Sequence, residues 1–115
     1  MTKRIIGLTE KIKIIGPEGK KKIILARIDT GATISSMDTK IAAQLNLGPV
    51  VKTKRIKSTH GSSSRAVIFA KVKVARKVMK AEFTLADRKH MKFPILIGQN
   101  ILRRGFLIDP TKGVN

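Results

Sequence analysis

The chain has 115 residues, of which 42% are hydrophobic, enough for one small domain with a single core. It has no cysteine, which excludes disulfide frameworks, thiolate zinc sites and cysteine nucleophiles. Its 25 Lys and Arg against 7 Asp and Glu give a net charge of +18, which favours an acidic partner. Because no apolar run approaches the length of a membrane span, we expect one soluble, cytoplasmic domain over residues 1–115.

The first part of the chain predicts a β-hairpin that leads into a short acidic motif. Two apolar runs within residues 5–25 flank the turn residues Gly16-Pro17-Glu18-Gly19. The second arm, residues 22–28, is rich in β-branched residues and ends at Asp29-Thr30-Gly31, where the glycine favours a turn. Asp29 is therefore expected at the end of a strand.

A short strand and a helix are predicted next. Residues 34–37 are typical of a strand, and Asp38 is a candidate N-cap for a helix over residues 39–47. Gly48-Pro49 would end that helix.

The middle of the chain predicts a second hairpin. Residues 50–57 and 66–74 have the alternation of strands and are joined by the small polar segment 58–64. In the second arm, Ile68, Ala70, Val72 and Val74 share one face, which we expect to be buried.

Four short elements complete the prediction. Residues 78–86 alternate like a strand, and residues 94–98 form an apolar strand that should be buried on both faces. Residues 99–104 predict a helical turn, and residues 106–108 a last strand.

This order of elements and motifs resembles the retropepsin-like aspartic peptidases. Asp29-Thr30-Gly31-Ala32 matches the catalytic turn of that family, and Ile95-Leu96-Ile97-Gly98 matches the apolar strand that runs beside it. The segments 87–98 and 106–110 are similar to the branch labelled ATP-dependent zinc proteases. The resemblance implies a mainly β fold, a closed acid-protease barrel with a flap hairpin and one or two short helices.

The resemblance also implies that Asp29, Thr30 and Gly31 are catalytic. Hydrolysis by this route needs two carboxylates that share one proton and a water. Since the chain has a single Asp-Thr-Gly, the second carboxylate must come from Asp29 of another copy in a twofold homodimer. Thr33 stands where many viral relatives carry an acidic residue.

Residues 59–65 are expected to form the tip of the flap, although an ordinary surface hairpin loop is the alternative. Seven further residues are expected to contact the substrate. Among them, the arginine and histidine side chains are expected to contact acidic groups of the substrate. The seven residues are Ala32, His60, Gly61, Arg65, Arg88, Ile97 and Gly98.

We expect neither a metal nor a cofactor. The sequence has no His-Glu-x-x-His helix and no glycine-rich phosphate loop. His60 and His90 are the only histidines, and there are no thiolates to help them hold zinc.

Members of the zinc-protease branch are associated with glutamate ligases of the ATP-grasp type, and some are similar to peptidases that trim oligoglutamate. Together with the charge of +18, this predicts an acidic, glutamate-rich peptide as substrate. A catalytically inactive dimerisation domain of the same fold is one alternative.

A nucleic-acid- or ribosome-binding module is the other alternative, and the lack of aromatic stacking residues disfavours it. It is supported by basic residues on predicted neighbouring strands, which could track phosphates. They are Lys52, Lys54, Arg55, Lys57, Lys71, Lys73, Arg76 and Lys77.

Overall fold

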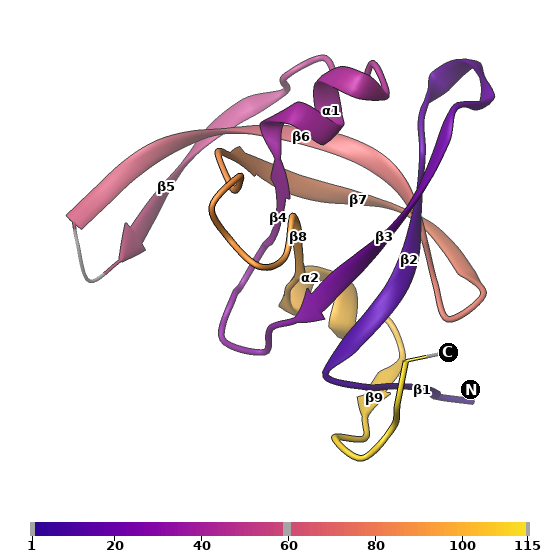
Figure 1. Ribbon diagram of the computed structural model, residues 1–115. Helices are drawn as coiled ribbons and strands as arrows, with labels where there is room; N and C mark the ends of the chain where they lie inside the picture. The colour runs from indigo at the N-terminus through magenta and orange to yellow at the C-terminus, as the bar shows by residue number, and fades with distance from the viewer. Residues whose placement is uncertain (1, 59–60, 115) are drawn as a thin grey trace.

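The computed structural model describes residues 2–58 and 61–114, and the chain is mainly β (Figure 1). Its strands are β1 (Arg4–Ile6), β2 (Thr9–Ile15), β3 (Lys21–Ile28), β4 (Ser35–Asp38), β5 (Lys52–Ser58), β6 (Gly61–Val74), β7 (Lys77–Ala86), β8 (Ile95–Ile97) and β9 (Phe106–Ile108). Its helical segments are η1 (Pro17–Gly19), α1 (Thr39–Gln44) and α2 (Gln99–Leu102). No helix among these described residues is long and apolar enough to cross a membrane.

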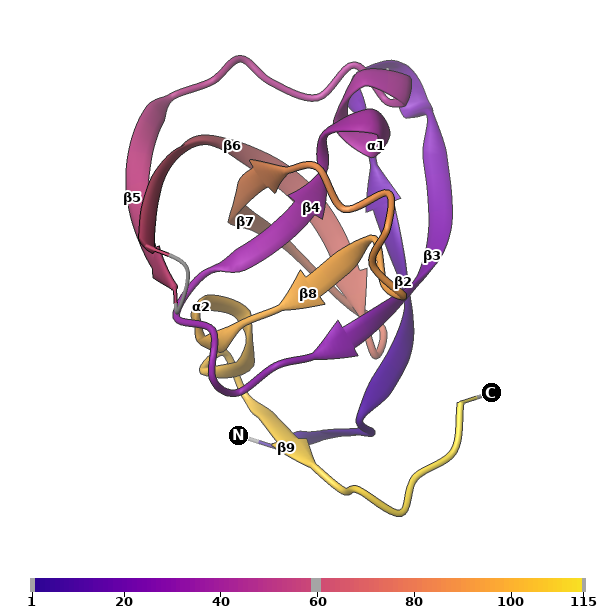
Figure 2. The same ribbon diagram turned by 60° about the vertical axis from the view of Figure 1, so that its left-hand side comes forward.

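Six strands form a closed barrel in the order β2-β3-β8-β4-β7-β6, which returns to β2 (Figure 2). The seam is an antiparallel pairing of β2 with β6, in which Ile14 lies opposite Val72. Closure removes the exposed edges that an open sheet would present. The predicted mainly β fold with a closed barrel is confirmed.

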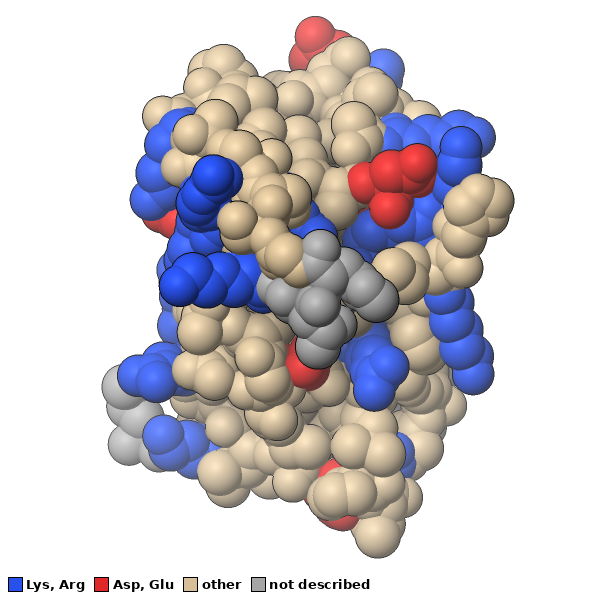
Figure 3. Space-filling model, turned by 90° about the vertical axis from the view of Figure 1, so that its left-hand side faces the viewer, with Lys and Arg blue, Asp and Glu red and all other residues tan. Residues whose placement is uncertain are grey.

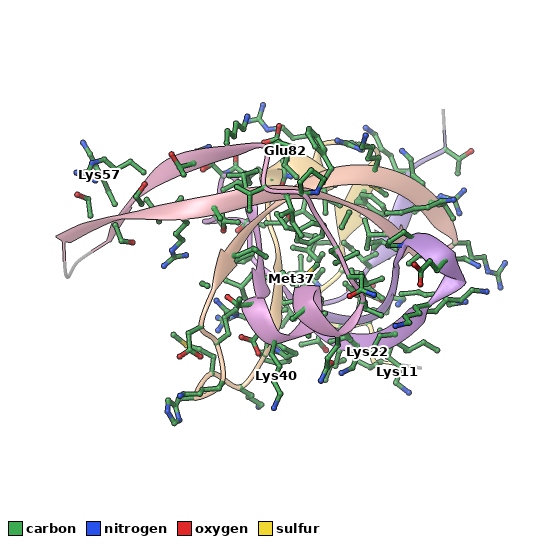
Figure 4. The ribbon with its side chains drawn as sticks, turned by 90° about the horizontal axis from the view of Figure 1, so that it is seen from above. Lys11, Lys22, Met37, Lys40, Lys57 and Glu82 are labelled. Carbon is green, nitrogen blue, oxygen red and sulfur yellow. The ribbon has the colours of Figure 1, made fainter. Side chains whose placement is uncertain are left out.

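Aliphatic side chains fill the barrel. In β6, Ile68, Ala70, Val72 and Val74 are buried, while Phe69 on the opposite face is exposed, as the alternation predicts. Figure 4, a view from above, shows Met37 within the barrel and Lys57 on a projecting arm.

The arm consists of β5 and the first half of β6, and it extends beyond the barrel (Figure 1). Its cross-strand pairs run from Lys52 and Val67 to Ser58 and Gly61. The prediction of a polar loop over residues 58–64 and a flap tip over 59–65 was therefore too wide, because residues 61–65 already belong to β6. Pairing with β5 outweighs the low strand propensity of the serines. Thr59 and His60 lie outside the described residues.

The first predicted hairpin begins later than expected. β1 is separated from β2 at Gly7 and pairs in parallel with β9, so that Ile5 lies opposite Leu107. The cause is the buried Glu10, whose carboxylate accepts a hydrogen bond from the Gly7 amide at 2.7 Å and pairs with Lys112 Nζ at 2.6 Å. The hairpin proper is β2–β3, with η1 as its turn.

The helix α1 is shorter than the predicted range of residues 39–47. It ends at Gln44, and the amide of Leu47 donates to the carbonyl of Ala42 at 2.9 Å in the turn that follows. Asp38 occupies the N-cap position, but its carboxylate makes no capping bond. It instead accepts from the Arg88 amide at 3.1 Å, which ties the helix start to the segment after β7.

Candidate active site

Asp29 lies directly after β3, where that strand pairs in parallel with β8. Its amide donates to the carbonyl of Ile97 at 2.9 Å, and its own carbonyl accepts from the amide of Ala32 at 3.2 Å. The backbone of Asp29 is thus fixed on one side by β8 and on the other by a tight turn. β8, which the sequence predicted to run beside the Asp29 turn, is the strand that fixes the Asp29 backbone.

The half-buried carboxylate of Asp29 is oriented by its own turn. Its Oδ1 accepts a hydrogen bond from the Gly31 amide at 3.0 Å. A Cβ at position 31 would lie 3.3 Å from Oδ1, which is a tight contact. Glycine at position 31 therefore lets backbone and carboxylate approach one another, while Thr30 and Gly31 themselves are exposed.

The first residue of α2 also holds the Asp29 turn. Gln99 contributes two bonds, from its amide to the Ala32 carbonyl and from Nε2 to the Thr30 carbonyl, both at 2.8 Å. Gly98 must be glycine for this approach, because a Cβ there would lie 2.8 Å from the Ala32 carbonyl oxygen. Sequence reasoning missed Gln99, whose position directly after the Ile-Leu-Ile-Gly segment was the available signal.

A buried polar network fixes α2 against the barrel. The hydroxyl of Ser35 donates to Asn100 Oδ1 at 2.8 Å and accepts from the Gly98 amide at 2.9 Å. Asn100 Nδ2 donates to the carbonyl of Glu82 at 2.9 Å, which joins the network to β7. Because buried polar groups of this kind are costly when unpaired, the network specifies one position for α2. Neither Ser35 nor Asn100 was singled out from the sequence.

A cleft of about 770 Å³ elsewhere on the barrel is apolar, whereas the cleft beside the Asp29 turn, about 530 Å³ in volume, is basic. The second cleft lies between residues 31–34 and the arm, and its lining contains five cations and no acidic residue. The cations are Lys54, Arg55, Lys57, Arg65 and Arg88. Figure 3, seen from the side on which the arm projects, shows Lys and Arg on both sides of this face.

Arg88 is the most constrained of these cations. Its Nε donates to the carbonyl of Phe93 at 2.9 Å, which fixes the guanidinium. Partial burial is the main cause that lowers the pKa of Arg88, and the nearby charge of Arg65 lowers it further. Asp38 and Asp29 act in the opposite direction, so Arg88 lies within electrostatic reach of the Asp29 carboxylate.

The other predicted site residues are placed as follows. Ala32 lines the cleft, and Gly61 is exposed at the start of β6. Ile97 and Gly98 are buried, and the Ile97 carbonyl accepts from the Asp29 amide; their contact with substrate stays a prediction. His60 lies outside the described residues. Within residues 2–58 and 61–114, no three His, Cys, Asp or Glu side chains gather to hold a metal ion.

Solved structures define the class of fold. A protein of unknown function, Lpg0085 from Legionella pneumophila subsp. pneumophila str. Philadelphia 1, is 20% identical with a TM-score of 0.65, over 97% of both chains. The protease of Simian Foamy Virus (mac) is 22% identical with a TM-score of 0.58, over 81% of this chain and 89% of that one. EIAV protease complexed with the inhibitor HBY-793 is 21% identical with a TM-score of 0.60, over 70% and 75% of the two chains. The fold is that of the retropepsin-like proteases.

Residues 37–114 match the RimB-like family, described as retropepsin-like aspartic endopeptidase RimB, and the chain belongs to this family. The matched region begins after the Asp29 turn. A "Probable alpha-L-glutamate ligase" of Desulfotalea psychrophila (strain LSv54 / DSM 12343) is 29% identical over 96% of this chain. The chain spans 29% of the length of that relative.

Proposed function

We propose that this chain is an aspartic-type endopeptidase that works as a homodimer, with one Asp29 carboxylate from each copy. The observation that carries the proposal is the position of Asp29, held between the Ile97 carbonyl and the Gly31 amide beside an open cleft. Membership of a retropepsin-like family agrees with it.

The chemistry requires two carboxylates in different protonation states. One Asp29 is ionised and takes a proton from a water as the water attacks the peptide carbonyl, and the other is protonated and polarises that carbonyl oxygen. The protonated carboxyl then helps to protonate the departing nitrogen. Because Gly31 engages Oδ1, the second oxygen of each Asp29 is left for the shared proton and the water. Because the chain has a single Asp-Thr-Gly and the described lining of the neighbouring cleft contains no acidic residue, the second carboxylate has to come from another copy.

The surface near the Asp29 turn suits a twofold contact. β1 and β9 lie side by side toward the end of the barrel at which β3 ends (Figures 1 and 2). Their paired residues Ile5 and Leu107 are 46% and 51% exposed, and Leu8 nearby is 54% exposed. A small sheet with exposed apolar residues favours association with another chain.

We infer that the substrate is an acidic, glutamate-rich peptide. The cleft lining carries five cations, and the net charge of +18 concentrates polyanions around the whole domain. The relative named as a glutamate ligase points in the same direction. Since much of this attraction acts between exposed groups, binding is expected to weaken steeply as salt is added.

The test compares the wild type with Asp29→Asn on two peptides of equal length, one rich in glutamate and one in glutamine. Products are identified by mass spectrometry at low salt, and the oligomeric state of both proteins is measured by ultracentrifugation. Fragments of the glutamate peptide with the wild type alone, from a dimer, are expected. Intact peptides with both proteins would remove the peptidase proposal.

Binding of nucleic acid is the second candidate function. It is favoured by lysines that face one another across strands, Lys13 opposite Lys73 and Lys71 opposite Lys80. Like charges in such positions repel, and a bound polyanion would relieve the repulsion. Asp29→Asn separates the candidates, because it should abolish peptide cleavage and leave nucleic-acid binding unchanged.

A further inference from the structure

Ser36 has a feature that neither the fold nor the proposed catalysis uses. It lies in β4 and is only 5% exposed, yet its hydroxyl is the one buried side-chain polar atom among the described residues without a hydrogen-bond partner. Its cross-strand neighbours are Thr84 of β7 and Leu96 of β8, and all three side chains line the basic cleft. A buried hydroxyl without a partner is unfavourable, so this one is suited to a group that enters the cleft.

Two guanidinium groups converge on the same space. Arg65, in the arm, and Arg88, after β7, both line the cleft with Ser36, and they are near enough for the charge of one to disfavour the charge of the other. Neither takes part in the three ion pairs found within the described residues. The Phe93 carbonyl holds Arg88 in place through Nε. Two cations that line one cleft and form no ion pair make a site suited to an anion.

We propose that Ser36, Arg65 and Arg88 form a subsite for a carboxylate of the substrate, beside the Asp29 turn. The proposal rests on the proposed function and names the contacts that select its substrate. A carboxylate has two oxygens that accept several hydrogen bonds, and it matches the planar fork of arginine. It would offset the repulsion between Arg65 and Arg88 and give the Ser36 hydroxyl an acceptor.

The subsite explains selectivity as well as attraction. Glutamine has the shape of glutamate but no charge, so it would leave both half-buried guanidinium groups without an ion-pair partner. The more exposed Lys54 and Lys57 attract any anion, whereas the subsite tells a carboxylate from its amide. In a twofold dimer the subsite occurs twice.

The first experiment measures binding without cleavage. Full-length Asp29→Asn protein is titrated by calorimetry, at constant ionic strength, with capped glutamate peptides, capped glutamine peptides of the same length, and glutamine peptides with a free C-terminal carboxylate. Preference for the capped glutamate peptide that falls in the Arg88→Met variant described below assigns the subsite to a side-chain carboxylate. Preference only for the free terminus assigns it to the terminal carboxylate. Equal affinity for all three peptides overturns the subsite.

The second experiment adds variants in the same background. Arg88→Met is expected to reduce the ratio of glutamate to glutamine affinity roughly ten- to hundredfold, the worth of one hydrogen bond to a charged group. Arg88→Lys should restore part of the ratio, because it keeps the charge and loses the fork. Arg76→Met, which removes the same charge from an exposed turn at the far end of β6, is the matched control and should leave the ratio unchanged.

Ser36→Ala separates a ligand-binding role of Ser36 from a purely structural one, because the two roles predict different changes in the thermal midpoint and in the affinity ratio. Since its hydroxyl has no partner in the free protein, its removal should leave the thermal midpoint unchanged or raised, while the affinity ratio falls about fivefold. A ratio that stays within about twofold in Ser36→Ala, Arg65→Met and Arg88→Met overturns the subsite even if the wild type cleaves peptides. An Arg88-dependent ratio in a protein that never cleaves supports the subsite and removes only the peptidase proposal.

Discussion

Gly98 and Ile34 approach each other so closely that a Cβ atom at position 98 would lie 2.9 Å from the carbonyl oxygen of Ile34. The contact joins the segment after β8 to the loop that follows the Asp29 turn. Backbone atoms on both sides leave no flexible side chain that could yield. The fit of α2 beneath the turn therefore depends on a missing methyl group.

Gly98→Ala is expected to lower the free energy of unfolding by about 1–3 kcal/mol, because the added methyl overpacks a backbone contact. Urea denaturation followed by circular dichroism measures the change. Gly113→Ala is the control, since a Cβ there meets nothing within 4 Å, and it should change stability by less than about 0.5 kcal/mol. Equal stabilities of the two variants would show that the loop yields without cost.

Asn100→Ala should lower the free energy of unfolding by about 2–3 kcal/mol, because it leaves the Ser35 hydroxyl, the Ser35 amide and the Glu82 carbonyl without their partner. Peptide cleavage should fall with it, since Asn100 is next to Gln99, which holds the Thr30 carbonyl. Denaturation and turnover are measured on the same preparation. Gln44→Ala, at an exposed position of α1, should alter neither.

Asp109 should titrate below its ordinary pKa of 3.8. The hydroxyl of Thr111 donates to Asp109 Oδ1 at 2.6 Å and is the main cause that lowers the pKa, with the Thr111 amide second. A lowered pKa in the folded state contributes stability that is present above the unfolded value and is lost as the pH falls through the folded value. Thr111→Val should raise the pKa of Asp109 toward 3.8, as measured by NMR titration of the carboxyl carbon. An unchanged pKa would contradict this role for the hydroxyl.

Lys112→Met should lower the free energy of unfolding by about 1–3 kcal/mol, because the buried Glu10 carboxylate loses its ion pair and keeps only the Gly7 amide. Thermal unfolding measures the loss. Lys40→Met removes an exposed lysine and should change stability little.

The local elements could be predicted from the sequence because their signals are local. Alternation in residues 68–74 identified the buried face of β6, and the apolar run before Asp29 put that residue at a strand end. Pairings between distant segments carry no such signal. The parallel contact of β1 with β9 and the seam between Ile14 and Val72 depend on the whole chain.

The candidate site divides in the same way. The Asp29 turn and the two arginines follow from residue type and motif, whereas Ser36 depends on the register of β4 between β7 and β8. A serine in a short strand has no unusual property until its neighbours are known. Similarly, Ser35 and Asn100 are 65 positions apart, and only the fold brings their polar groups together.

The length of β6 has a mechanical consequence. This single strand of 14 residues pairs with β5 in the arm that lines the basic cleft at one end, and forms the seam of the barrel with β2 at the other. Moving the arm away from the cleft must bend β6 or loosen its pairing with β2. A movement at the cleft therefore also changes the distant seam of the barrel. A ligand bound in the cleft between the arm and the Asp29 turn should slow the exchange of amide hydrogens along that remote seam.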